Sequence, residues 1–249
     1  MRGKKKWYML HRWLGLLVSL QLLAWSTGGF MFSILDIENV RGNADRTNTP
    51  VATIDPTTIR LSPAEALAVA GAGGVNVGEL SSLRLRSRFG RSVYEFFDIK
   101  DRPAGAVDAE TGEWHSRITE SQARQAALDD FAPSVTVTSV TLIEENTPLE
   151  FRGGLLPVYQ VILDHPKNPH YYVCPVTGEV LKRRNRPWRL FDFFWMLHIM
   201  DYGERENFNH WLLTSFSVLA ILTSVSGLML WSWRVPKRVF KKSFSEPCP

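Results

Sequence analysis

The chain of 249 residues contains only two cysteines, Cys174 and Cys248, and neither belongs to a Cys-x-x-Cys pair. The sequence therefore offers no cysteine framework for a zinc site or for a thioredoxin-like redox site. It also lacks a Walker motif, a Gly-x-Ser-x-Gly element and a His-Glu-x-x-His element. These absences exclude the nucleotide, hydrolase and zinc-protease chemistries that depend on those motifs.

Charged residues are missing from two long segments. Trp13 to Leu35 and Asn207 to Trp233 contain no Asp, Glu, Lys or Arg. A helix needs about 20 apolar residues to cross the hydrocarbon core of a bilayer. Both segments are long enough, so the sequence predicts two transmembrane helices and excludes a purely soluble cytosolic protein. The first segment is longer than the apolar part of a typical signal peptide, and we expect it to be retained.

Basic residues are concentrated at the two ends of the chain. Residues 1–12 and 234–249 carry a net charge of +9, and because the whole chain carries +4, residues 13–233 carry −5. A nucleic-acid protein places its basic patch on the folded domain, so we expect no nucleic-acid partner. Basic residues beside apolar spans mark the cytoplasmic side. Both termini are therefore predicted to be cytoplasmic, with the region between the spans outside.

The middle of the chain predicts two similar units, each with one helix and several strands. In the first unit, residues 36–115, Ser62 opens a Ser-Pro-Ala-Glu helix start, and a glycine cluster at 71–74 ends the helix. Residues 82–88 and 92–99 alternate in polarity or are rich in aromatic and β-branched side chains. These patterns predict two strands.

The same order recurs in the second unit, residues 116–186. A capping-box sequence predicts a helix from Thr119 to about Phe131. Strands are predicted at 136–144 and 156–164, followed by a last strand and turn. Each unit contains a Thr-Gly-Glu sequence after its strands, which indicates an internal repeat.

These units resemble the PepSY domain, a small module of one helix and an antiparallel sheet that often closes with an Asp-x-x-Thr-Gly turn. Asp108, Thr111 and Gly112 match that turn in the first unit, whereas Cys174 stands in place of the acid in the second. The resemblance implies a compact binding or inhibitory module without chemistry of its own.

Three of the six histidines lie next to the predicted membrane segments. Ionisable side chains in such places are costly and more often functional than decorative. His11 comes two residues before the first span, His210 begins the second span, and His198 lies just before it. The other three are interpreted as solvated surface groups: His115, His165 and His170.

His11 has two interpretations. Gly15 lies one helical turn further along the same face, and a glycine there removes the side chain that would obstruct a flat macrocycle. Arg12 is placed to meet an anionic group such as a propionate or a lipid phosphate. The same His-Arg-Trp sequence is also typical of an interfacial anchor, whose aromatic and basic groups lie among the lipid headgroups.

An aromatic stripe at helical spacing precedes the second span: Phe191, Phe194, Trp195 and His198. It predicts a helix that lies on the membrane surface with its aromatic side down. On the second span, Ser217 and Ser224 share a face with His210, and Gly227 lies nearby. Small residues there permit close helix contact or leave room for a flat cofactor. His198 and His210 are thus predicted to converge at the outer face.

The chain as a whole resembles the PepSY-associated transmembrane proteins. The matching elements are the basic N-terminus, His-Arg-Trp-Leu-Gly-Leu from His11, the PepSY-like turns, and a closing Met-Leu-His…Asn-His-Trp span with Ser-Gly-Leu-Met-Leu-Trp. The resemblance implies an α+β membrane protein in the bacterial inner (cytoplasmic) membrane, whose central PepSY-like domain is periplasmic or extracellular. Its segments would be a basic tail at 1–12, a transmembrane helix at 13–35, PepSY-like units at 36–115 and 116–186, an interfacial helix at 187–206, a transmembrane helix at 207–233 and a basic tail at 234–249.

Some members of that family are haem-b membrane reductases in siderophore-iron uptake. The resemblance therefore implies haem b with axial ligation of its iron by His11, His198 and His210, and Arg12 and Gly15 would lie beside the cofactor. The larger reductases have more than two spans, so this chain is not expected to be a self-sufficient monomeric reductase.

Geometry restricts how these histidines pair. The two spans run in opposite directions, so His11 and His210 are predicted about 30 Å apart across the hydrocarbon core and cannot share one iron. An outer haem would use His198 and His210. An inner haem would need a second His11, from a homodimer, or a ligand from a partner membrane subunit. Ligation by two histidines leaves no open site for oxygen chemistry, so it suits electron transfer.

Two classes of function remain open from the sequence. The first is a haem-b electron-transfer protein that supports ferric-iron or siderophore-iron reduction, with electrons from a quinol or a cytoplasmic flavoprotein because the chain has no flavin or nicotinamide motif. The second is a non-enzymatic, membrane-tethered PepSY binding module in which the histidines are anchors. An accessory subunit of a larger membrane complex is compatible with either.

Overall fold

The computed structural model describes residues 2–48 and 53–234, with side chains from Lys5 onward. These residues form two compact units. We call residues 2–35 and 190–234 the helical unit, and the described residues between Asp36 and Arg189 the sheet unit. Each unit is described separately.

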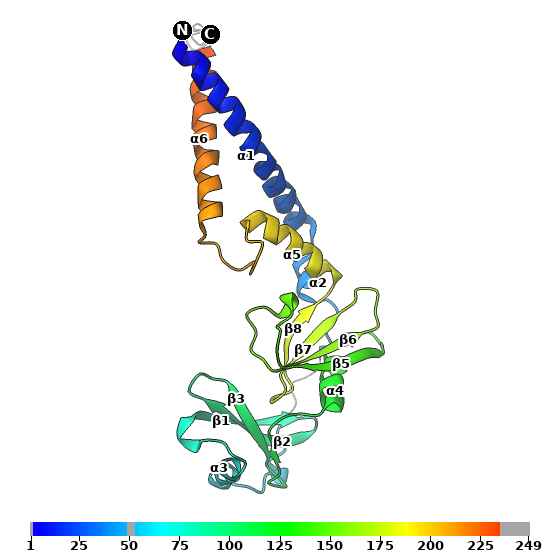
Figure 1. The fold of residues 1–249 in the computed structure, drawn as a ribbon. Helices are drawn as coiled ribbons and strands as arrows, with labels where there is room; N and C mark the ends of the chain where they lie inside the picture. The colour runs from blue at the N-terminus through cyan, green and yellow to red at the C-terminus, as the bar shows by residue number, and fades with distance from the viewer. Residues whose placement is uncertain (1, 49–52, 235–249) are drawn as a thin grey trace, which may run out of the picture. The chain divides into compact units, whose positions relative to one another are not determined.

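Two long apolar helices make up most of the helical unit. They are α1 (Arg2–Ile34) and α6 (Trp211–Arg234), which lie side by side with the start of α1 near the end of α6 (Figure 1). Both are long and apolar enough to cross a membrane. Leu20 and Leu228 are among many apolar side chains that stay exposed on them, as expected for helices surrounded by lipid. The helix predicted from Trp13 begins earlier, because lysine and arginine favour helix and extend it through the basic N-terminal segment.

The third helix of this unit, α5 (Arg186–Ile199), begins in the sheet unit and continues into the helical unit. Its aromatic stripe packs against α1. The ring centroid of Phe32 on α1 lies 4.7 Å from that of Phe191 and 5.6 Å from that of His198. Aromatic rings of α1 thus cover part of the stripe, and the position of α5 at the membrane surface stays a prediction.

The sheet unit begins with a module in which one helix covers a four-stranded antiparallel sheet (Figure 1). Ser62 and Glu65 form the predicted capping box at the start of the helix. Ala66 and Ala70 on the helix pack against Phe96 of the sheet, and all three are fully buried. Small alanines let the helix lie close to the sheet. The elements are α3 (Pro63–Ala72), β1 (Leu80–Arg88), β2 (Arg91–Asp98), β3 (Pro103–Asp108) and β4 (Trp114–His115), with strand order β1-β2-β3-β4.

The second module repeats this arrangement. Thr119 and Gln122 form its capping box, and Ala123 and Ala127 pack on the sheet beneath. The elements are α4 (Glu120–Asp130), β5 (Val137–Ile143), β6 (Val158–Leu163), β7 (His170–Val173) and β8 (Val180–Arg184), with strand order β5-β6-β7-β8. Short helical turns connect the elements of the unit: α2 (Ile37–Arg41), η1 (Pro56–Thr58), η2 (Val77–Glu79) and η3 (Leu149–Phe151).

The turns that end the third strand of each module confirm the internal repeat. Gly112 donates its N–H to the carbonyl of Asp108, and Gly178 donates to the carbonyl of Cys174, each at 2.9 Å. Both glycines have φ near +75°, which favours glycine. Cys174 therefore occupies the backbone position of the acid, and the turn keeps its shape without a carboxylate.

The two modules contact each other through the β1–β2 hairpin. Phe89 at its tip packs on Gly178, where a Cβ atom would come within 3.0 Å of the ring. Arg88 donates a hydrogen bond to the carbonyl of Val176 in the second module. These contacts hold the modules together as one unit.

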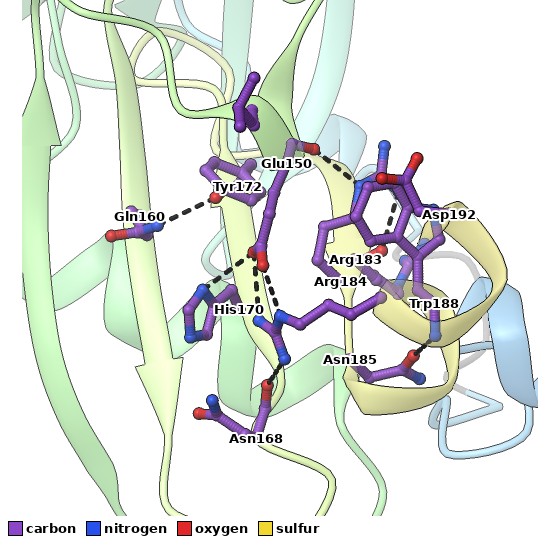
Figure 2. A network of polar contacts seen from close by, with 12 residues as sticks. Glu150, Gln160, Asn168, His170, Tyr172, Arg183, Arg184, Asn185, Trp188 and Asp192 are labelled. Carbon is purple, nitrogen blue, oxygen red and sulfur yellow. Dashed lines mark hydrogen bonds and ion pairs between the residues drawn. The ribbon is translucent and has the colours of Figure 1, made fainter. Parts of the chain in front are cut away.

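A partly buried carboxylate, that of Glu150, lies at the other end of the second module (Figure 2). A carboxylate oxygen of Glu150 lies 3.1 Å from Nδ1 of His170, and both of its oxygens accept hydrogen bonds from the Arg189 guanidinium. Burial raises the pKa of Glu150, but the His170 and Arg189 contacts outweigh burial and lower the pKa to about 2. The interpretation of His170 as a solvated surface group is wrong, because the fold places it next to this acid with only 18% of its side chain exposed.

Candidate functional site

The histidine of the first span, His11, lies between α1 and α6. Its Nδ1 atom is 2.7 Å from the Ser226 hydroxyl oxygen. That hydroxyl already donates its proton to the carbonyl of Thr223 at 2.8 Å. A hydroxyl has only one proton, so while Ser226 donates to Thr223 it accepts from His11, and Nδ1 of His11 carries a hydrogen. In the neutral ring the lone pair is then on Nε2.

A glycine on α6 allows this close approach. A Cβ atom at Gly227 would lie 3.3 Å from Cε1 and 3.8 Å from Nε2 of His11. At Gly15, the glycine that the sequence placed beside His11, a Cβ atom would meet no described residue within 4 Å outside the backbone of its own helix. Gly15 therefore leaves open space on α1, whereas Gly227 is the glycine in contact with the ring.

His11 borders a pocket of about 740 Å³, which we call the His11 pocket. This volume is within the usual range of about 300–1,000 Å³ for small-molecule sites. Its walls combine apolar and aromatic groups with three cations, so it suits a largely apolar ligand that carries an anionic group. The lining residues are Lys5, Tyr8, Met9, His11 and Arg12 of α1 with Gly227, Leu230, Trp231 and Arg234 of α6.

The structure places His11 and Arg12 at one pocket and adds residues that sequence reasoning missed. Tyr8 and Arg234 meet there, with the guanidinium 5.1 Å from the ring centroid. Ser226 was missed because its neighbours on α6 gave no sign of which face would meet α1. The adjacent Ser-Gly pair was the only signal available.

His198 is held in the contact between α1 and α5. Its carbonyl accepts a hydrogen bond from Trp25 Nε1 at 2.7 Å. Its Nδ1 atom is buried and has no hydrogen-bond partner among the residues that the structure describes. A Cβ atom at Gly28 would lie 3.6 Å from that nitrogen. His198 thus has a buried polar atom whose lone pair or proton is unused within the helical unit.

His210 uses both of its ring nitrogens. A carbonyl only accepts, so Nε2 donates to the carbonyl of Ile199 at 2.9 Å, and Nδ1 accepts the Leu213 N–H at 3.4 Å. His210 therefore caps the start of α6 and ties it to the end of α5. The predicted convergence of His198 and His210 on one iron would require both contacts of His210 to break.

These positions allow a test of whether haem fits. Haem iron needs an imidazole lone pair, and His11 supplies one beside a pocket with cations for the propionates. The described residues hold no group of three or more His, Cys, Asp or Glu side chains that could bind a metal ion by themselves. The His11 pocket therefore offers one axial ligand for a haem iron. No second histidine is among the described residues that line it.

A family model described as the PepSY-associated TM region matches residues 1–234. The chain belongs to this family. This PepSY-associated protein is thus a membrane protein whose apolar helices flank two antiparallel four-stranded modules. Comparison with curated proteins and with solved structures finds no match for the chain.

Proposed function

We propose that this PepSY-associated protein is a haem-b electron-transfer component of the bacterial cytoplasmic membrane, with His11 as an axial ligand at the cytoplasmic side. The proposal rests on which nitrogen of the His11 ring carries the hydrogen. Ser226 accepts the Nδ1 proton, which leaves the Nε2 lone pair beside a pocket with a cationic rim. Metal-binding histidines commonly donate their other ring N–H to an oxygen in this way.

A bound haem would supply a one-electron redox centre, and the protein would supply its position and its electrostatic surroundings. His11 would hold the iron, and Ser226 would fix the orientation of the His11 ring. Arg12 and Arg234 would attract the two propionate groups. Gly227 would keep α6 close to the ring without a side chain between them.

The second axial ligand would come from another polypeptide. His210 precedes α6, and Ser226, which contacts His11, lies 16 residues further along the chain. At about 1.5 Å per residue, His210 is therefore about 24 Å from the level of His11. His198 contacts Gly28, which is likewise about 25 Å along α1 from His11. A symmetric homodimer would supply matched pairs, His11 with His11 and His198 with His198, at two levels.

Two such levels would give electrons a route across the membrane. Basic residues at both ends of the chain favour cytoplasmic termini, so the His11 level would receive electrons from a quinol or a cytoplasmic flavoprotein. The His198 level would pass them to ferric iron or a ferric siderophore outside. Membrane lipid would surround the exposed apolar faces of α1 and α6.

A membrane-tethered binding module is the second candidate. It is favoured by a cleft of about 600 Å³ between the two modules of the sheet unit, with Phe89, Arg183 and Val180 among its lining residues. Ligand sites often form at such junctions. In this alternative the histidines near the membrane are anchors and the chain carries no redox centre.

An absorbance spectrum of the full chain, purified from haem-replete cells, separates the two functions. We expect a Soret band with sharp α and β bands after reduction. His11→Ala should remove the haem at the inner level and spare the one at the His198 level, whereas His115→Ala, a change on the sheet unit, should leave the spectrum unchanged. A folded but colourless wild-type protein would falsify the haem proposal and leave the binding module.

A further inference from the structure

A second, smaller pocket lies in the sheet unit, between the first module and the start of α4. It has a volume of about 180 Å³, which is about six times the ~30 Å³ that a water molecule occupies in the liquid. This space is large enough for a carboxylate or phosphate group and a few attached atoms. We call it the arginine pocket. Its polar lining consists of Arg88, Arg91, Asp108, His115, Arg117 and Gln122.

Cations outnumber anions among the residues that line the arginine pocket, although each arginine has a carboxylate within 4.0 Å. Three guanidinium groups face one carboxylate, that of Asp108. Asp108 is only 2% exposed, and its Oδ1 already accepts the N–H groups of Glu110 and Thr111 at 2.9 Å each. The carboxylate therefore serves mainly to hold its own turn, and only Oδ2 is left for Arg91, at 3.2 Å.

Arg88 is the least exposed of the three arginines. Only 9% of its side chain is exposed, yet its hydrogen bond within the described residues goes to a neutral group, the carbonyl of Val176. The nearest carboxylate oxygen, on Glu95, is 4.0 Å away. Burial lowers the pKa of the Arg88 guanidinium, and burial raises the pKa of Glu95, so neither charge fully stabilises the other.

Arg117 and Gln122 can donate to a ligand at a small cost in free energy. Arg117 pairs with Glu144 at 2.7 Å, but both side chains are about half exposed, and such pairs contribute about 0–1 kcal/mol. Gln122 accepts the Thr119 N–H through its carbonyl oxygen, which leaves its NH₂ group as a donor. A ligand that enters the pocket therefore meets guanidinium forks and an amide donor.

We propose that the arginine pocket binds an oxyanion, a carboxylate or phosphate group of a small extracytoplasmic ligand. Arginine forks match the paired oxygens of both groups, and an anion there would compensate the buried charge of Arg88. A cationic ligand would face three like charges. The site lies entirely in the sheet unit and is independent of haem binding.

The test uses the full chain in nanodiscs and isothermal titration calorimetry with two probes, inorganic phosphate and citrate. Sodium chloride at matched ionic strength corrects for general screening. We expect saturable binding of at least one probe. Stronger binding of phosphate would identify a phosphate ligand, and stronger binding of citrate would identify a carboxylate ligand.

Two variants and a matched control make the test specific. Arg91→Gln and Arg117→Gln change side chains that are 65% and 46% exposed, so the fold should be retained. Each should weaken binding at least tenfold, because each removes a charge-assisted hydrogen bond. Arg60→Gln removes an exposed arginine outside the pocket and should change the affinity less than twofold. Absence of saturable binding in the wild type, or equal weakening in the Arg60 variant, overturns the proposal.

Discussion

Replacement of Ser226 by alanine tests the state of the His11 ring directly. The change removes the oxygen that accepts the Nδ1 proton at 2.7 Å. Without that acceptor, the ring is free to exchange its proton between the two nitrogens and to rotate. The lone pair at the His11 pocket is then no longer fixed.

The expected magnitude follows from the two roles of the bond. A neutral hydrogen bond contributes about 0.5–1.5 kcal/mol, which corresponds to about a 2- to 13-fold change in an equilibrium constant. Loss of the hydrogen-bond partner of a metal-binding histidine lowers metal affinity by about 10- to 100-fold. The two ranges overlap at about tenfold, so Ser226→Ala should weaken haem binding by about that factor.

The assay is haem titration of the full chain, followed by redox potentiometry of the reduced α band. Ser226→Thr keeps the hydroxyl and should restore most of the affinity. Ser224→Ala is the matched control, because the Ser224 hydroxyl bonds only within its own helix, to the carbonyl of Ala220 at 2.9 Å. ¹⁵N NMR of histidine-labelled protein gives a readout without haem: the His11 signals should show a hydrogen on Nδ1 in the wild type.

The outcomes separate two kinds of failure. If Ser226→Ala and Ser224→Ala bind the inner haem equally well while His11→Ala loses it, the positioning role of Ser226 is refuted and His11 remains a ligand. If His11→Ala also retains the inner haem, the proposed ligand itself is wrong.

Three further predictions concern the fold. Glu150→Gln should destabilise the sheet unit by an amount on the order of 3 kcal/mol at neutral pH, because the pKa of this acid falls from 4.5 to about 2 on folding. The contribution is present above pH 4.5 and is lost as pH falls through 2, so melting curves of variant and wild type should converge in that window. Gly178→Ala should lower the melting temperature because of its positive φ and the ring 3.0 Å away, and more than Gly74→Ala, which has a positive φ but open space. Gly28→Leu should separate α5 from α1 and speed proteolysis after α5. Gly29→Leu should not, because a Cβ atom there meets no described neighbour within 4 Å. Equal proteolysis rates for the two variants would contradict this packing.

The sequence by itself determined the elements of this protein. Uncharged runs identified the two long helices, because a bilayer requires a fixed apolar length. The capping boxes at Ser62 and Thr119 identified the module helices, because they satisfy backbone N–H groups through side chains a few residues away. The repeated Thr-Gly turn indicated the duplication. All three signals depend on neighbours along the chain.

Only the tertiary structure decided which faces meet. The sequence grouped Ser217 and Ser224 with His210 and placed Gly227 near them, whereas in the structure Ser226 and Gly227 contact His11. An apolar helix that is hydrophobic on every side carries no periodicity to indicate its rotation, so the contact depends on the fit against α1.

The same reason applies to the ring nitrogens and to the aromatic stripe. A histidine beside a membrane span has the same local sequence whether it binds a ligand, caps a helix as His210 does, or packs in a helix contact as His198 does. His170 and Glu150 are likewise separated by 20 positions in the sequence, and only the folded sheet brings them into contact. Hydrogen-bond partners that are distant in the chain are decided by packing, because no local pattern specifies them.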